Sequence, residues 1–132
     1  MSFLLDTDTC SAYLKNDQRA VGKVMLHFGG LYLSVVAMGE LLTWAKRKNA
    51  SVNRVQGVRR FLTACMVLEI DETVAERFSD LRAALLDQGR PVGSMDLFNA
   101  ATALVHNLTL VTHNTSDNSR IPGLTLTDWL AP

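Results

Sequence analysis

The chain opens with Phe3-Leu4-Leu5-Asp6-Thr7-Asp8-Thr9, an apolar run that stops at an acidic residue. Buried parallel strands read as continuous apolar runs, and open α/β sheets place their chemistry at the carboxyl ends of such strands. We therefore expect a strand over residues 2–6 that delivers Asp6 to the edge of a sheet. Our hypothesis is that Asp6 is the first of four carboxylates that hold a divalent cation, the others being Glu40, Asp96 and Asp117.

The bulk composition indicates one globular domain spanning residues 1–132. The 132 residues are 48% hydrophobic and 20% charged, which is typical of folded rather than disordered proteins. Thirteen basic residues balance thirteen acidic ones, so net charge alone does not attract nucleic acid. Any binding of nucleic acid would have to come from a local basic patch.

Three further features bear on where the protein works. Cys10 and Cys65 lack a CxxC partner, and we interpret both as buried, reduced thiols. No apolar run approaches the ~20 residues of a membrane span. The N-terminus lacks the charged and apolar regions of a secretory signal. We expect a cytoplasmic protein that does not associate with a membrane.

Strands and helices are expected to alternate along the whole chain. Apolar runs predict strands over residues 2–6, 31–33, 66–70, 109–111 and 124–126. Helical spacing of apolar residues, with caps at Ser34, Asp71 and Ser94, predicts helices over residues 9–15, 17–28, 34–48, 51–64, 71–88 and 94–105. This alternation predicts a single α/β domain with a mostly parallel central sheet of four to five strands flanked by helices.

The acidic residues fall where the sheet topology allows them to meet. Glu40 lies in the second turn of the helix after the second strand, Asp96 in the first turn of a later helix, and Asp117 in the loop after the fourth strand. Two carboxylates ~4 Å apart repel by about 4 kcal/mol at an effective dielectric near 20. Four of them in one pocket need a cation, and oxygen ligands without a His or Cys cluster favour Mg²⁺ or Mn²⁺.

Four stretches in the right order resemble the motifs of the PIN-domain ribonucleases, and within them the VapC-type toxins of bacterial toxin–antitoxin pairs. The stretches are Leu-Leu-Asp-Thr-Asp-Thr-Cys (4–10), Ser-Val-Val-Ala-Met-Gly-Glu-Leu-Leu (34–42), Gly-Arg-Pro-Val-Gly-Ser-Met-Asp-Leu (89–97) and Thr-Leu-Val-Thr-His-Asn-Thr-Ser-Asp-Asn-Ser-Arg-Ile-Pro-Gly-Leu (109–124). The chain departs from the family pattern at two positions: Asp8 stands where Asn is usual, and Ser94 stands where Asp is frequent.

The resemblance implies a metal-dependent endoribonuclease with a single PIN-like domain. By it, Asp6, Glu40, Asp96 and Asp117 would bind one or two Mg²⁺ or Mn²⁺ ions, and water would attack the phosphodiester to leave a 5′-phosphate and a 3′-hydroxyl. The implied substrate is a structured RNA such as a transfer RNA. The implied partners are an antitoxin on a separate chain and a second copy in a homodimer.

Several further residues are candidates for supporting roles. The hydroxyl of Thr112 could orient a water or a carboxylate, Asn114 could bond to Asp6 or to RNA, and Asp8 adds a fifth acid. Each is also an ordinary strand-end or turn residue. A run of basic residues could bind RNA phosphates. A solvated helix face or an antitoxin-docking surface explains the run equally well. Its members are Lys46, Arg47, Lys48, Arg54, Arg59 and Arg60. We interpret His27, His106 and His113 as non-catalytic because they lack ligand spacing.

Two other functions remain open from the sequence. A haloacid-dehalogenase-type phosphatase also begins with an apolar strand that ends in Asp-x-Asp, with Asp6 as the nucleophile and Asp8 as the general acid. That assignment leaves Glu40 without a role and would be recognised by an aspartyl-phosphate on Asp6. A non-catalytic PIN-fold binding module is the third candidate, and it would gain no thermal stability from added metal.

Overall fold

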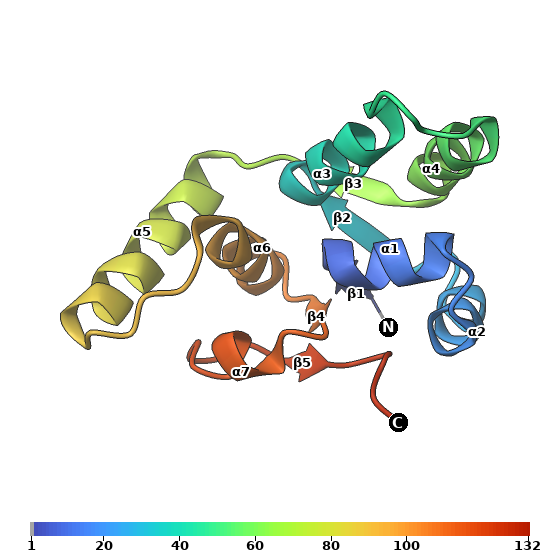
Figure 1. The fold of residues 1–132 in the computed structure, drawn as a ribbon. Coiled ribbons are helices and arrows are strands. Elements are labelled where there is room, and N and C mark those ends of the chain that lie inside the picture. The colour runs from blue at the N-terminus through green and yellow to red at the C-terminus, as the bar shows by residue number, and fades with distance from the viewer. Residues whose placement is uncertain (1) are drawn as a thin grey trace.

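The central strand β1 (Phe3–Leu5) has parallel neighbours on both sides in the computed structural model, which describes residues 2–132. The sheet also contains β2 (Leu31–Ser34), β3 (Met66–Leu68), β4 (Thr109–Val111) and β5 (Leu126–Thr127). Every neighbouring pair is parallel, and the strand order is β3-β2-β1-β4-β5 (Figure 1). The predicted parallel α/β sheet is confirmed, with five strands.

Seven helices connect and cover these strands in the described chain. They are α1 (Thr7–Leu14), α2 (Gln18–Leu26), α3 (Val35–Lys46), α4 (Val52–Ala64), α5 (Glu72–Asp87), α6 (Ser94–Val105) and the single-turn α7 (Thr115–Asn118). Side chains of Asp17, Ser34, Ser51 and Asp71 cap the backbone N–H groups at the starts of α2 to α5. No helix among residues 2–132 is both long and apolar enough to span a bilayer.

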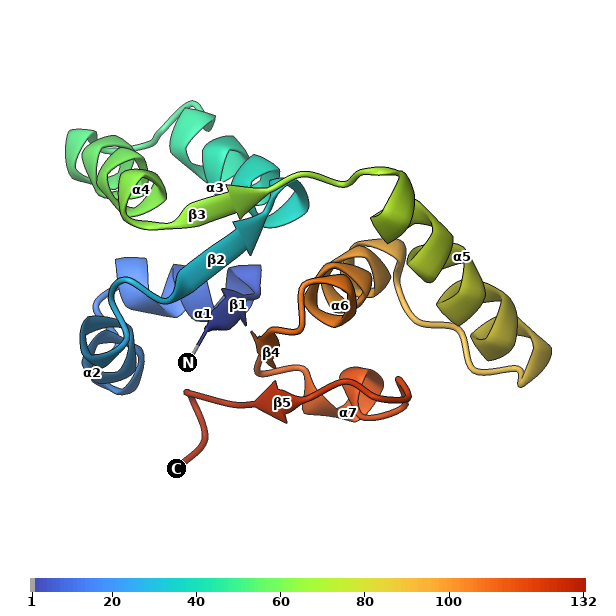
Figure 2. The ribbon, with the colours of Figure 1, turned by 180° about the vertical axis from the view of Figure 1, so that it is seen from behind.

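The two faces of the sheet are buried by different helices, as the two opposite views show (Figures 1 and 2). One face packs against α1 to α4 and contributes Phe3, Leu5, Leu31, Leu33 and Val111. Cys10 joins this core with no exposure, as the sequence predicted. The other face, with Leu4 and Leu110, packs against Ala103 of α6. Helix α5 then covers α6, where the rings of Phe78 and Phe98 stack with centroids 4.0 Å apart.

The strand order places a topological switch point beside β1. The chain leaves β1 for β2 on one side, and it later returns through α5 and α6 to β4 on the other side. Connections that diverge in this way leave a crevice at the carboxyl ends of the two central strands. Asp6 follows β1 and Thr112 follows β4, so both lie at this crevice.

Several element boundaries differ from the predicted ones. The first strand ends before Asp6, because Asp6 is the N-cap of α1 and starts that helix at Thr7 instead of Thr9. Ser94 was predicted as a cap, but Gly93 holds that position without a side-chain bond. Asp117 lies in α7 and not in a loop. The third strand is shorter than residues 66–70, and the fifth begins at Leu126 rather than at residue 124.

Candidate active site

Asp6 is a buried carboxylate held by three hydrogen-bond donors. Its Oδ1 accepts the backbone N–H of Thr7 at 2.8 Å and the side-chain amide of Asn99 at 3.1 Å. Its Oδ2 accepts the hydroxyl of Thr112 at 2.8 Å. Asp6 is only 8% exposed, and this burial, followed by the charge of Asp8, raises its pKa from 3.8 to about 6. The Thr112 hydroxyl thus contacts the carboxylate of Asp6, and its role in orienting that group stays a prediction.

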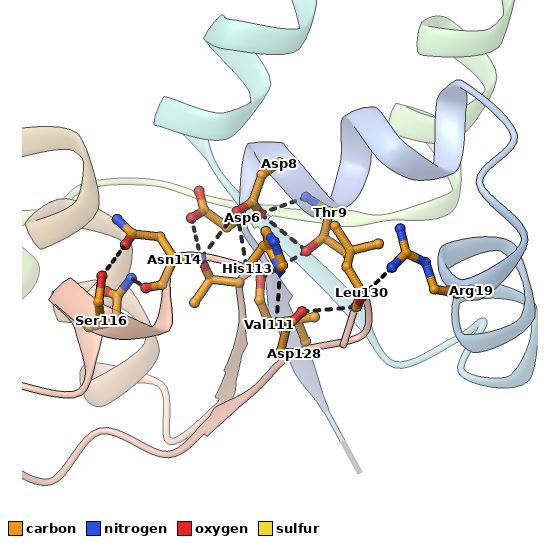
Figure 3. Close-up of polar contacts among 12 residues, drawn as sticks. Asp6, Asp8, Thr9, Arg19, Val111, His113, Asn114, Ser116, Asp128 and Leu130 are labelled. Carbon is orange, nitrogen blue, oxygen red and sulfur yellow. Dashed lines mark hydrogen bonds and ion pairs between the residues drawn. The ribbon is translucent and has the colours of Figure 1, made fainter. Parts of the chain in front are cut away.

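Asp8 brings a second carboxylate to the same strand end (Figure 3). It lies in the first turn of α1, and its Oδ1 accepts the backbone N–H of Thr9 at 2.6 Å. Its Oδ2 accepts the backbone N–H of His113 at 3.0 Å, which ties α1 to the segment after β4. The Thr112 hydroxyl is 3.5 Å from the same oxygen. Asp8 is therefore held as an acceptor by backbone groups on both sides.

Glu40 reaches the site from α3. Its Oε1 accepts the hydroxyl of Thr7 at 2.6 Å, which joins it to the residue that follows Asp6. Glu40 is half-buried, so it is not a freely solvated side chain. The second turn of α3 thus faces the end of β1.

Asp96 and Asp117 form the opposite wall of the site. The Asn114 amide lies between them, with its Nδ2 at 3.4 Å from Asp96 Oδ2 and at 3.2 Å from Asp117 Oδ2. Asn114 therefore bonds to these two acids, and not to Asp6, which was one of the partners considered for it. Burial raises the pKa of Asp96, and the charges of Asp117, Asp8 and Glu40 raise it further.

The site gathers all four predicted acids and adds Asp8. The charges of neighbouring acids raise the pKa values of Asp6 and Asp96. Hydrogen bonds connect Asp6 to Thr112, Glu40 to Thr7 and Asp117 to Asn114. Such a set of crowded oxygen donors fits a hard divalent cation, which would relieve the mutual repulsion. Within residues 2–132, however, no three His, Cys, Asp or Glu side chains are arranged to hold one ion. A shared ion would need these side chains to rotate toward one another.

Sequence reasoning missed two residues of the site, Thr7 and Asn99. Asn99 is 2% exposed and lies on α6 one turn after Asp96. The available signal was a polar residue inside the otherwise apolar stripe of this helix, between Leu97 and Ala101. A buried amide needs hydrogen-bond partners, so such an interruption indicates a nearby polar group.

The basic run lies away from the carboxylates. Lys46, Arg47 and Lys48 are exposed at and just after the C-terminal end of α3. Lys46 lies about 9 Å along the helix axis from Glu40 at 1.5 Å per residue. Arg54 lies on α4 and is half-buried, with its guanidinium 4.5 Å from the centroid of the Trp44 ring. Arg54 therefore already has a packing partner, whereas the three residues at the end of α3 face solvent.

Comparisons with known proteins agree with this fold. The chain matches the PIN domain family over residues 3–123. It is 32% identical to the tRNA(fMet)-specific endonuclease VapC of Shigella flexneri, over 98% of both chains. It is 27% identical to ribonuclease VapC1 of Haemophilus influenzae, over 98% of both chains.

Solved structures give the same result. The chain superposes on one chain of the DNA-bound VapBC complex from Salmonella typhimurium with a TM-score of 0.90, 31% identity and 98% coverage of both chains. It superposes on VapBC-1 from nontypeable Haemophilus influenzae with a TM-score of 0.86 and 26% identity, over 99% of this chain and 100% of the other. The chain therefore belongs to the PIN-domain family, and the two curated relatives named above are a VapC endonuclease and a VapC ribonuclease.

Proposed function

We propose that this protein is a divalent-metal-dependent endoribonuclease, the toxin of a toxin–antitoxin pair, in which Asp6, Glu40, Asp96 and Asp117 hold Mg²⁺ or Mn²⁺. The observation that carries the proposal is the crowding of carboxylates at the switch point of a parallel sheet, where Asp6 and Asp96 both have raised pKa values. Its relatives at 27–32% identity are named ribonucleases or endonucleases, which supports RNA hydrolysis as the reaction.

The chain's own groups would prepare the site for this chemistry. A divalent cation supplies charge stabilisation at a phosphoryl oxygen and makes water nucleophilic near neutral pH. Thr112 and Thr7 donate hydroxyl hydrogen bonds to Asp6 and Glu40, and Asn114 donates to Asp96 and Asp117. These bonds keep the four acids at one edge of the sheet, so only a rotation of their side chains would be needed to assemble them around a cation.

The geometry disfavours the phosphatase alternative. A general acid must be free to reach the leaving group, but both Asp8 oxygens already accept backbone N–H groups, from Thr9 and from His113. Glu40, which has no role in a phosphatase, is bonded into the site through Thr7. A binding module that keeps only the fold would not need this network of hydrogen bonds to carboxylates.

The proposed substrate is a structured RNA such as a transfer RNA. Lys46, Arg47 and Lys48 are the candidate phosphate contacts, because they are exposed and unscreened by nearby acids on their own stretch. Arg54, which is half-buried, is a fourth candidate for a phosphate contact. Replacing Lys48 with Ala should weaken RNA binding about equally for all RNA sequences. The slope of log K against log salt concentration should become smaller in magnitude by about 1, because one lost phosphate contact releases about one counterion less.

An antitoxin on a separate chain is the proposed protein partner. Several structural neighbours were solved as VapBC complexes, which supports this type of partner. The surface offers a groove of about 400 Å³ between α1, α2 and α4, with Tyr13, Leu14, Phe28 and Phe61 among its lining residues. Met25, also in the lining, is 57% exposed, an unusual position for a large apolar side chain. An apolar segment of the antitoxin would bury this surface.

Cleavage of bulk transfer RNA by the purified protein tests the proposal. Discrete fragments should form with Mg²⁺ or Mn²⁺, disappear with a chelator, and be absent for Asp96→Asn. Asp80→Asn, which removes an exposed carboxylate from α5, is the matched control and should cleave like the wild type. Wild-type cleavage by Asp96→Asn, or full cleavage in chelator, would overturn the proposal. We also propose that the free protein is a homodimer. Sedimentation of the free protein tests this.

A further inference from the structure

Asn99 occupies a buried position between two polar groups from different elements. It lies in α6, one turn after Asp96, and is 2% exposed. Its Nδ2 donates to Asp6 Oδ1 at 3.1 Å, and its Oδ1 accepts the hydroxyl of Ser34 at the end of β2. The side chain therefore links the ends of β1 and β2 behind the carboxylate cluster.

The orientation of the Asn99 amide is determined by its partners. An ionised Asp6 has no proton to donate, so the amide NH₂ must face it. The Ser34 oxygen already accepts the backbone N–H of Ala37 at 3.2 Å, which leaves the Ser34 hydroxyl proton for the Asn99 oxygen. Three hydrogen bonds thus run in one direction, from the N-terminus of α3 through Ser34 and Asn99 to Asp6. Such a chain polarises each of its members.

This arrangement treats the two Asp6 oxygens differently. Oδ1 accepts two N–H donors, from Thr7 and Asn99, whereas among residues 2–132 Oδ2 accepts only the Thr112 hydroxyl. A carboxylate oxygen has about two lone-pair sites, so Oδ1 is saturated and Oδ2 keeps one site free. Oδ2 is also the oxygen on the side of Thr112, whose hydroxyl is 3.5 Å from Asp8.

We propose that Asn99 is a positioning residue that saturates Asp6 Oδ1, leaves Asp6 Oδ2 as the metal-binding oxygen, and thereby sets the affinity of the site for Mg²⁺ or Mn²⁺. The inference rests on the proposed function, because it assumes that Asp6 is a metal ligand. Asn99 itself is not a ligand, since its only two heteroatoms are directed at Asp6 and Ser34. Partners that orient a metal ligand typically change metal affinity by 10–100-fold when they are replaced.

Mn²⁺ titration of the RNA-free protein tests this role without using activity. Asn99→Leu keeps a side chain branched at the same carbon but removes the donor to Asp6. The matched control is Thr102→Val on the same helix, where a fully buried hydroxyl is lost that bonds only to the Phe98 carbonyl, at 2.7 Å. We expect Asn99→Leu to bind Mn²⁺ 10–100-fold more weakly than wild type, while Thr102→Val binds within about twofold.

Cleavage should separate a positioning role from general damage. Excess Mg²⁺ should restore most of the turnover of Asn99→Leu, because the metal ligands are intact and only their affinity is lowered. A variant that is merely misfolded would not recover. Circular dichroism spectra of Asn99→Leu and Thr102→Val should both match wild type.

A measurement on the wild-type protein covers the case in which Asn99→Leu does not fold. The side-chain amide resonances of Asn99 should shift on addition of saturating Mg²⁺, whereas those of the exposed Gln88 at the end of α5 should not. Unchanged Asn99 resonances with bound metal, or an Mn²⁺ affinity of Asn99→Leu equal to wild type, would overturn this inference alone. A wild-type protein that binds no divalent cation would overturn it together with the proposed function.

Discussion

Removing the charge of Asp6 should stabilise the metal-free protein at neutral pH. The pKa of Asp6 is raised from 3.8 to about 6 by burial and by the charge of Asp8. The folded protein therefore binds this proton more tightly than the unfolded chain does. Ionisation of Asp6 in the folded protein therefore lowers the free energy of unfolding. This loss of stability is absent below about pH 3.8, grows as the pH rises, and is complete above about pH 6. At about 1.4 kcal/mol per pKa unit, the full cost is roughly 3 kcal/mol.

The perturbation is Asp6→Asn, which preserves the shape and leaves an oxygen to accept from Thr7 and Asn99. Its amide nitrogen would face the Thr112 hydroxyl, which can accept a hydrogen bond. In chelator at pH 7.5 the variant should be more stable than wild type by up to about 3 kcal/mol, and at pH 4 the two should be nearly equal. Addition of Mg²⁺ should stabilise wild type and leave the variant unchanged.

Urea denaturation followed by circular dichroism, in chelator at intervals from pH 4 to 8, measures this difference. Asp80→Asn, at an exposed position on α5, controls for the loss of one surface charge. A stability difference between Asp6→Asn and wild type that does not change with pH would refute the reasoning. An Asp6→Asn variant less stable than wild type at pH 7.5 would show that the hydrogen bonds to the carboxylate outweigh its burial.

Two further substitutions have defined outcomes. Thr112→Val removes the hydroxyl that donates to Asp6 Oδ2, so metal affinity should fall 10–100-fold in an Mn²⁺ titration. An unchanged affinity would contradict the role assigned to Thr112. Arg54→Ala removes a guanidinium that packs on the Trp44 ring, so urea denaturation should show a loss of about 0.5–1 kcal/mol. An Arg54→Ala protein as stable as wild type would show that this contact contributes nothing.

The fold was largely predictable because its strands and helices are marked locally. β1, β2 and β4 are apolar runs bounded by polar residues, and the helices that follow β2 and β3 begin at capping side chains, Ser34 and Asp71. One boundary was wrong because a single residue has two roles. Asp6 follows a strand and caps a helix, so α1 begins at Thr7, two residues earlier than predicted.

The site was predictable only in part, because it depends on contacts between distant segments. The parallel topology implied that Asp6, Glu40, Asp96 and Asp117 share one sheet edge, and hydrogen bonds and shared electrostatic effects connect them there. The partners of each acid could not be deduced. Asp6 or RNA was considered as the partner of Asn114, but its amide bonds to Asp96 and to Asp117, which the helical turn of α7 carries to it.

The position of Mn²⁺ in crystals of the protein tests the central claim most directly. Anomalous diffraction should show a peak about 2.0–2.2 Å from Asp6 Oδ2, with a second ligand from Asp96, at the carboxyl edge of β1. The carboxylates would then have rotated together around the ion. A well-occupied Mn²⁺ peak elsewhere, or none at the acid cluster in crystals grown with millimolar Mn²⁺, would contradict the assignment of this sheet edge as the metal site.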